Sequence, residues 1–114
     1  MAIQTTTQKN NLATAYATNA THGAVYTTAP GGTAGTEPTG GSPAYARKPL
    51  SWSAASNGVV TVSPVFDIPS GSTIVGAGVH TALTAGTYLD GASVTSQAFA
   101  SQGTYTVTFT YTQS

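Results

Sequence analysis

Few side chains in this 114-residue chain could carry acid–base chemistry. A serine, a histidine and an aspartate could form a hydrolase triad, because triads are recognised by geometry and not by their order along the chain. However, no G-x-S-x-G motif is present to expose a nucleophilic serine. We therefore expect the chain not to be an enzyme. The ionisable candidates are His22, His80, Glu37, Asp67 and Asp90.

A metal or phosphate site is not expected either. His22, His80 and Asp90 could be drawn together as ligands, but their spacing matches neither H-E-x-x-H nor an EF-hand loop. Each histidine is expected at a rim or on the surface, and Asp67 and Asp90 stand beside turn residues, where aspartate usually bonds its own backbone. The chain has no cysteine, and residues 31–41 lack the phosphate-loop pattern. The sequence thus predicts no metal and no cofactor.

Charge is scarce throughout the chain. Charged residues make up 5 % of it, whereas an ordinary soluble domain has about 25 %. The three cations, Lys9, Arg47 and Lys48, cannot form the basic stripe that neutralises phosphates, so direct nucleic-acid binding is not expected. No apolar run approaches the roughly 20 residues of a membrane helix. A neutral protein lacks mutual repulsion, which suits a member of a dense assembly.

The first predicted element is a short amphipathic helix over residues 5–19. One of Thr5, Thr6 or Thr7 could serve as its N-cap and Asn19 as its terminator. Its apolar stripe is narrow, so the helix is expected to lean on a sheet or on a neighbouring chain. The stripe consists of Leu12, Ala13, Tyr16 and Ala17.

A predicted strand at residues 24–27 is followed by a long loop over residues 29–43, with three prolines and five glycines. We call residues 29–48, which contain this loop, the arm. Loops of such length are usually either mobile or functional. We expect the arm to drape over a partner, because it has almost no charge to keep it solvated. A flexible surface loop is the alternative.

Beyond the arm the sequence predicts short strands separated by turns. Residues 50–55 alternate in character, and Asn57-Gly58 is a strong hairpin signal. The returning strand covers residues 59–66, and Pro64 places it at an edge or at a bulge.

A turn at residues 69–72 precedes a strand at residues 73–80 with two unlike faces. One face is expected to point to the core. The other is nearly bare, and glycine in a strand often marks close approach by another element. The core face carries Val75, Ala77 and Val79, and the bare face carries Ile74, Gly76, Gly78 and His80.

Two strands complete the pattern. Tyr88 and Leu89 form a short one, which ends at the turn signal Asp90-Gly91. Residues 104–112 alternate strictly, with aromatic residues and valine on one face and threonines on the other. The apolar face is expected to be buried in a core or an interface.

These elements predict an all-β protein. The expected fold is an antiparallel β-sandwich or barrel-like fold of about six or seven short strands, with a short N-terminal helix and a long Gly/Pro-rich arm. A single domain is expected. Residues 1–48 supply its helix, first strand and arm, and residues 49–114 supply its β-sandwich core.

Four residues are predicted to bind a partner: Tyr45, Arg47, Lys48 and Tyr16. Tyr45 stands in the arm, where an aromatic side chain suits an interface anchor. Arg47 would be a strong anchor if it finds a carboxylate, since guanidinium pairs are bidentate. Alternatively, Arg47 and Lys48 merely keep a surface soluble. Trp52 alternates with serines and is expected in the core, although the aromatic residues could also form a sugar-binding platform.

Six short motifs are similar to those of a known family. They are Gly40–Lys48, Ser51–Ala55, Phe66–Gly71, Gly78–His80, Gln97–Phe99 and Ser101–Tyr105. Together they resemble a family of small virion proteins of tailed bacteriophages, many of them phages of actinobacteria. The resemblance covers most of the chain from about Gly40 onward and, more loosely, the N-terminal helix.

The resemblance implies a structural protein of the virion, labelled in this family either as head decoration or as tail fibre. It brings no catalytic residues. A capsid decoration protein that binds the major capsid protein and copies of itself is favoured, because a fibre usually needs a longer chain. The expected location is thus the capsid surface, after synthesis in the host cytoplasm. The alternatives are a tail fibre or minor tail protein and, third, a carbohydrate-binding module.

Overall fold

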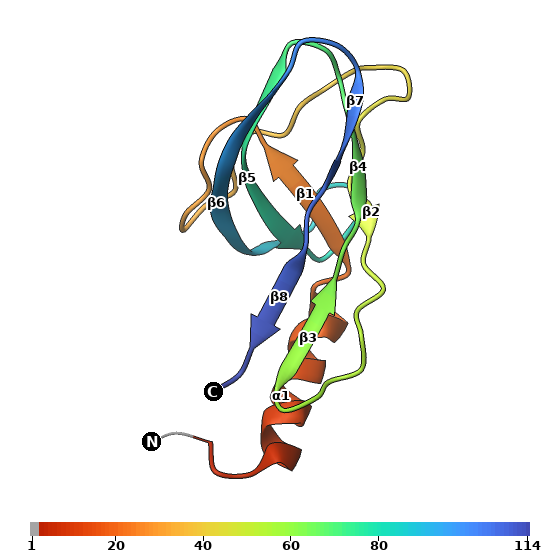
Figure 1. The fold of residues 1–114 in the computed structure, drawn as a ribbon. Coiled ribbons are helices and arrows are strands. Elements are labelled where there is room, and N and C mark those ends of the chain that lie inside the picture. Colours follow the sequence, from red (N-terminus) through yellow and green to blue (C-terminus); the bar gives the residue numbers. More distant parts are fainter. Residues whose placement is uncertain (1–2) are drawn as a thin grey trace.

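The computed structural model describes residues 3–114 as mostly antiparallel strands with one short helix (Figure 1). This confirms the all-β class, and the strands of the described residues form open sheets rather than a closed barrel. Residues 1 and 2, the start of the predicted N-terminal part, lie outside the described residues. The elements are α1 (Thr6–Asn19), β1 (His22–Tyr26), β2 (Lys48–Pro49), β3 (Val59–Val62), β4 (Val65–Ile68), β5 (Ser72–His80), β6 (Tyr88–Phe99), β7 (Gly103–Thr106) and β8 (Phe109–Thr112).

The predicted helix is confirmed. The Thr5 hydroxyl accepts a hydrogen bond from the Gln8 N–H at 3.2 Å, which satisfies one of the free donors of the first turn. Ala13 is fully buried, while the rest of the predicted stripe is half-buried, and the helix leans on β3 and β8. No helix among residues 3–114 is long and apolar enough to span a membrane.

Strands β3 and β4 run antiparallel to β8 and β7 as one ribbon. Val62 lies opposite Phe109 and Val65 opposite Thr106, so the register continues across the gap between the strands. The gap falls at Pro64, which has no N–H for the ladder but accepts from the Val107 N–H at 3.1 Å. The run predicted over residues 104–112 is therefore divided into two strands.

The same hairpin continues past a bend. The chain turns at Gly71, whose φ is +81°, and Ser72 of β5 then pairs with Phe99 of β6. Figure 1 shows β3, β4 and β5 running up one side and back down, with β6, β7 and β8 alongside. The C-terminal half of the molecule is thus one long hairpin folded over on itself.

The tip of this hairpin differs from the prediction. Asp90 and Gly91, predicted as a turn, lie inside β6 opposite Val79 and Gly78. A β-carbon on Gly91 would stand 2.5 Å from the Tyr88 hydroxyl, so this glycine provides space rather than a turn. The turn lies at residues 81–87, which we call the tip loop.

Strand β1 lies between β2 and β5, and the four-stranded sheet has the order β2-β1-β5-β6. The Asn57-Gly58 turn is confirmed, with φ of 52° and 77°. The strand predicted at residues 50–55 does not form, because β3 takes β8 as its ladder partner. The segment before the turn is joined to β3 only by the bridge from Ser56 to Val59 and by hydrogen bonds between Ser53 and Thr61.

The core lies between the sheet and the folded-back ribbon. Its buried side chains are Val25, Phe66, Ile68, Ile74, Ala77 and Val107. A register shift between Ile74 and Gly76 changes the face that the strand presents, so Ile74 joins the core while Val75 is only half-buried. The predicted core face of β5 is therefore correct at Ala77 and Val79 and wrong at Val75.

Candidate functional site

The arm lies against the glycine-bearing face of the four-stranded sheet. A β-carbon on Gly76 would overlap the Pro30 ring, and one on Gly35 would overlap the Thr28 carbonyl oxygen and stand 2.7 Å from the Tyr26 β-carbon. Close approach by another element at the bare face of β5 is thereby confirmed. The approaching element is the arm, which covers the chain's own sheet.

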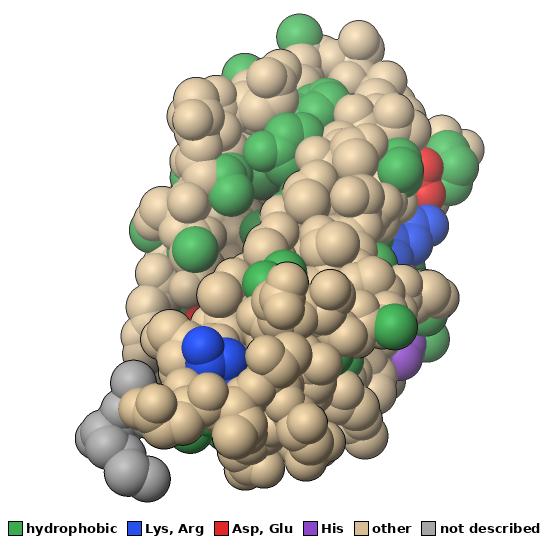
Figure 2. Space-filling view, turned by 60° about the horizontal axis from the view of Figure 1, so that its bottom comes forward, with side chains coloured by type: hydrophobic (Ala, Val, Ile, Leu, Met, Phe, Trp, Pro, Cys, Tyr) green, Lys and Arg blue, Asp and Glu red, His purple; other side chains and the backbone are tan. Residues whose placement is uncertain are grey.

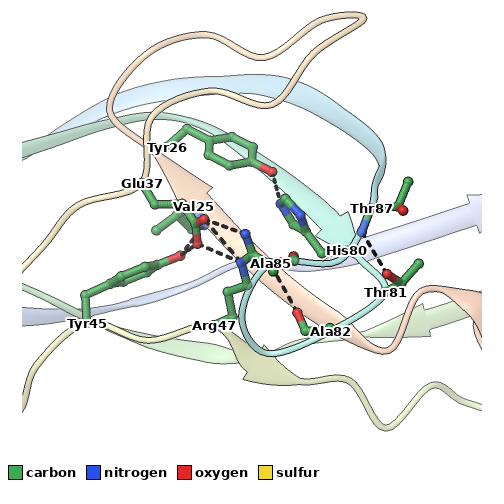
Figure 3. Close-up of polar contacts among 10 residues, drawn as sticks. All are labelled: Val25, Tyr26, Glu37, Tyr45, Arg47, His80, Thr81, Ala82, Ala85 and Thr87. Atoms are coloured by element: carbon green, nitrogen blue, oxygen red, sulfur yellow. Dashed lines mark hydrogen bonds and ion pairs between the residues drawn. The ribbon is translucent and has the colours of Figure 1, made fainter.

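Arg47 fastens the arm on two sides (Figure 3). Its Nη2 donates to Glu37 Oε2 at 2.8 Å, and its Nε lies 3.1 and 3.2 Å from the two carboxylate oxygens. Its Nη1 donates to the carbonyl oxygens of Ala82 and Ala85 in the tip loop, at 3.0 and 2.9 Å. The side chain is 12 % exposed. Arg47 thus finds its bidentate carboxylate within its own chain.

Tyr45 completes this cluster from the other side of Glu37. Its hydroxyl donates to Glu37 Oε1 at 2.8 Å and accepts from the Val25 N–H at 3.2 Å, and its ring packs near Phe66. Burial raises the pKa of Tyr45, and the neighbouring Glu37 adds to the rise. Burial alone would raise the pKa of Glu37, but the hydrogen bonds from Arg47 and Tyr45 outweigh it and lower that pKa overall.

The other two predicted contact residues stand elsewhere. Lys48 lies 3.2 Å from Asp67 in a partly exposed ion pair, so Asp67 is not a turn aspartate as predicted. Tyr16 stacks on Tyr111 with ring centroids 3.9 Å apart and donates its hydroxyl to Asp90 at 2.9 Å. Burial, with the Asp90 carboxylate second, raises the pKa of Tyr16. The structure therefore joins Tyr45 to Arg47 through Glu37, while Tyr16 belongs to a separate cluster.

An apolar cleft of about 310 Å³ adjoins Tyr16. Its walls include Trp52, Asp90, Val94 and Phe109. Trp52 is half-buried rather than in the core, because its ring stands edge-on to Tyr16 and its Nε1–H donates to the Ala20 carbonyl oxygen at 2.8 Å. Asp90 does bond its own backbone, with Oδ1 accepting from the Gly91 N–H at 2.9 Å.

His80 is not at a rim, contrary to the prediction. It is 2 % exposed at the end of β5, and its Nε2 lies 2.6 Å from the Tyr26 hydroxyl. His22 is half-buried beside the Thr21 hydroxyl. The contact of Tyr26 with His80 and the pairing of Glu37 with Arg47 are not predicted by any motif or spacing. The only signal in the sequence was that His80 shares a strand face with glycines, which leave room for a neighbouring element.

The charged side chains of these clusters mostly contact other parts of the same chain. Among residues 3–114 no three His, Asp or Glu side chains gather closely enough to hold a metal ion. Four of the six charged side chains are engaged in two ion pairs within the chain. Figure 2 shows the result on one face, where the surface is mostly neutral and cationic side chains occupy two small areas. No family model, curated protein or solved structure matches the chain.

Proposed function

We propose that this chain is a non-enzymatic structural protein of a bacteriophage virion. It would bind the outer surface of the capsid as a decoration protein, with the major capsid protein and further copies of itself as partners. Two things support the proposal: the resemblance of its motifs to small virion proteins, and a surface whose charges are largely neutralised within the chain. The neutralised surface is the structural observation that carries the proposal.

A neutral surface suits permanent docking, because a buried charge without a partner is costly. Breaking a buried ion pair by removing one member costs about 3–5 kcal/mol. Here the pairs Arg47–Glu37 and Lys48–Asp67 need no partner charge, and the Thr side chains of β7 and β8 expose hydroxyls instead. Hydroxyls can exchange water for a partner's polar groups at modest cost.

The finer fold proposal is an open antiparallel sandwich. The four-stranded sheet contributes Val25, Ile74 and Ala77 to the core, and the folded-back ribbon contributes Phe66 and Val107. Such a rigid body would present its arm and its tip loop together on one side, joined by Arg47.

The experiment compares phage particles with and without the protein. Stripped particles are expected to lose resistance to heat and osmotic shock and to regain it when the purified protein is added back. Among the four predicted contacts, Lys48 gives the cleanest variant, because its side chain is 34 % exposed and its loss should leave the fold intact. Lys48→Ala should weaken add-back, whereas the exposed Thr73→Ala on β5 should not.

Other outcomes would assign the protein differently. Stripped capsids of undiminished strength, together with reduced adsorption to host cells, would support the tail fibre instead. Specific binding of the purified protein on a glycan array, lost in Trp52→Ala, would support a carbohydrate-binding module at the cleft beside Tyr16.

A further inference from the structure

His80 stands where three parts of the molecule meet. It ends β5 and directly precedes the tip loop, its ring lies 6.0 Å from the Tyr26 ring of β1, and it lies 5.6 Å from the Tyr88 ring of β6. Figure 3 shows the His80 ring next to Tyr26, with the Arg47–Glu37 pair of the arm nearby. A change in the protonation state of His80 would therefore affect the sheet, the arm and the tip loop together.

The buried ring has a place for only one proton. Its Nε2 meets the Tyr26 hydroxyl at 2.6 Å, whereas its Nδ1 is buried and has no hydrogen-bond partner among the described residues. A neutral imidazole carries one N–H, but an imidazolium carries two. If His80 took up a proton without moving, its charged Nδ1–H would have no acceptor. Protonation therefore either leaves this donor unsatisfied or forces the ring to move.

The surrounding groups oppose the charge as well. Burial lowers the pKa of His80, and the positive charge of Arg47 lowers it further, while Glu37 acts in the opposite sense. The Glu37 carboxylate is already engaged by Arg47 at 2.8 Å. Tyr26 and Tyr88 offer neutral hydroxyls, and His22 lies directly opposite His80 on β1.

We propose that His80 is an acid-sensitive latch: uptake of a proton by its imidazole breaks the contact with Tyr26 and releases the arm and the tip loop from the sheet. Release would spread because the arm packs on Tyr26 at Gly35, and because Arg47 holds the tip loop that follows His80. This inference goes beyond the proposed virion role and does not rest on it.

The sign follows from linkage between proton binding and opening. In the open state His80 has the ordinary pKa of about 6.5, and in the closed state a lower one. The open state therefore binds more protons. The full preference for the closed state is present above about pH 6.5, and it falls by about tenfold per pH unit below that value, until the lower pKa is reached. Glu37 stays ionised over this range, because its own pKa is lowered.

Hydrogen exchange of two amides at the start of the arm measures the opening directly. The Thr27 N–H donates to the Thr36 carbonyl oxygen at 2.7 Å, and the Thr36 N–H donates to the Thr28 hydroxyl at 2.8 Å, so both amides report on arm closure. Exchange is followed by NMR on the full chain between pH 7.5 and 5, with intrinsic rates divided out. Protection in the wild type should fall about tenfold per pH unit below about pH 6.5.

Two variants identify the sensor. His80→Gln should make protection independent of pH, while His22→Gln should keep the wild-type slope. A flat wild-type profile, or a His80→Gln protein with the wild-type slope, would overturn the proposal. If His80→Gln does not fold, the wild-type imidazole signals decide: His80 must stay neutral while the arm amides remain protected. An imidazolium at His80 beneath a closed arm would refute the latch.

Discussion

The Arg47 guanidinium joins the arm to the tip loop. It pairs with Glu37, ten positions earlier in the sequence, and donates to two tip-loop carbonyl groups. No spacing rule links Arg47 to Glu37, because irregular chain has no period from which a contact can be read. Whether Arg47, Tyr45, Lys48 and Tyr16 also contact a partner stays a prediction.

Removing this guanidinium should be costly. In Arg47→Ala the Glu37 carboxylate keeps only the Tyr45 hydroxyl, and two carbonyl groups lose their donor, so we expect a loss of about 2 kcal/mol in the free energy of unfolding. Lys48→Ala is the matched control and should cost about 0.5 kcal/mol or less, since Lys48 is more exposed than Arg47 and makes a single contact with its carboxylate. Urea unfolding at constant m measures both values. Equal losses in the two variants would contradict this ranking.

Among the helix, strands and turns, the features predicted correctly are those that depend on residues close together in the sequence. Thr5 caps the helix and Asn57-Gly58 makes its turn, because the conformation of each is favoured by its own residue types. Gly91 misled the prediction, because it accommodates the Tyr88 hydroxyl rather than a turn. The segment around Trp52 misled it too, since its indole bonds the end of the helix 32 residues earlier.

A glycine of β5 permits a direct test of the packing within the four-stranded sheet. A β-carbon on Gly78 would stand 2.5 Å from the Tyr26 hydroxyl and 2.8 Å from the Asp90 carbonyl oxygen. Gly78→Ala should therefore destabilise the fold by about 1–3 kcal/mol. Gly31→Ala, in the arm, meets nothing within 4 Å and should be neutral or slightly stabilising. The thermal midpoints of the two variants check this, and a tolerated Gly78→Ala would show that Tyr26 can move aside.

The whole molecule depends on its first segment more than composition indicated. Composition separates residues 1–48 from the strand-rich remainder, yet β1 lies inside the four-stranded sheet and supplies Val25 to the core. Tyr26, from the same strand, is also fully buried. The two parts therefore share one core.

Residues 49–114 should not fold alone. Without β1, the edge of β5 and one wall of the core would face water, which removes the burial that Val25 and Tyr26 provide. The isolated segment is expected to give an NMR spectrum with little dispersion, and addition of a peptide covering residues 3–48 should restore dispersion if the pieces can reassociate. A well-dispersed spectrum of the segment by itself would show two independent folding units.

The folded-over hairpin also determines the order in which the strands can pair during folding. Val59 pairs with Thr112, and His22 pairs with His80, so the outermost ladders join positions more than fifty residues apart. Closing such wide spans costs chain entropy before any contact repays it, which places folding in the slow regime of milliseconds to seconds rather than microseconds. During synthesis, the edge of β1 that pairs with β5 stays unpaired until β5 has left the ribosome. A neutral strand with an unpaired edge can pair with a strand of another copy. Expression at high concentration should therefore favour aggregation over native folding.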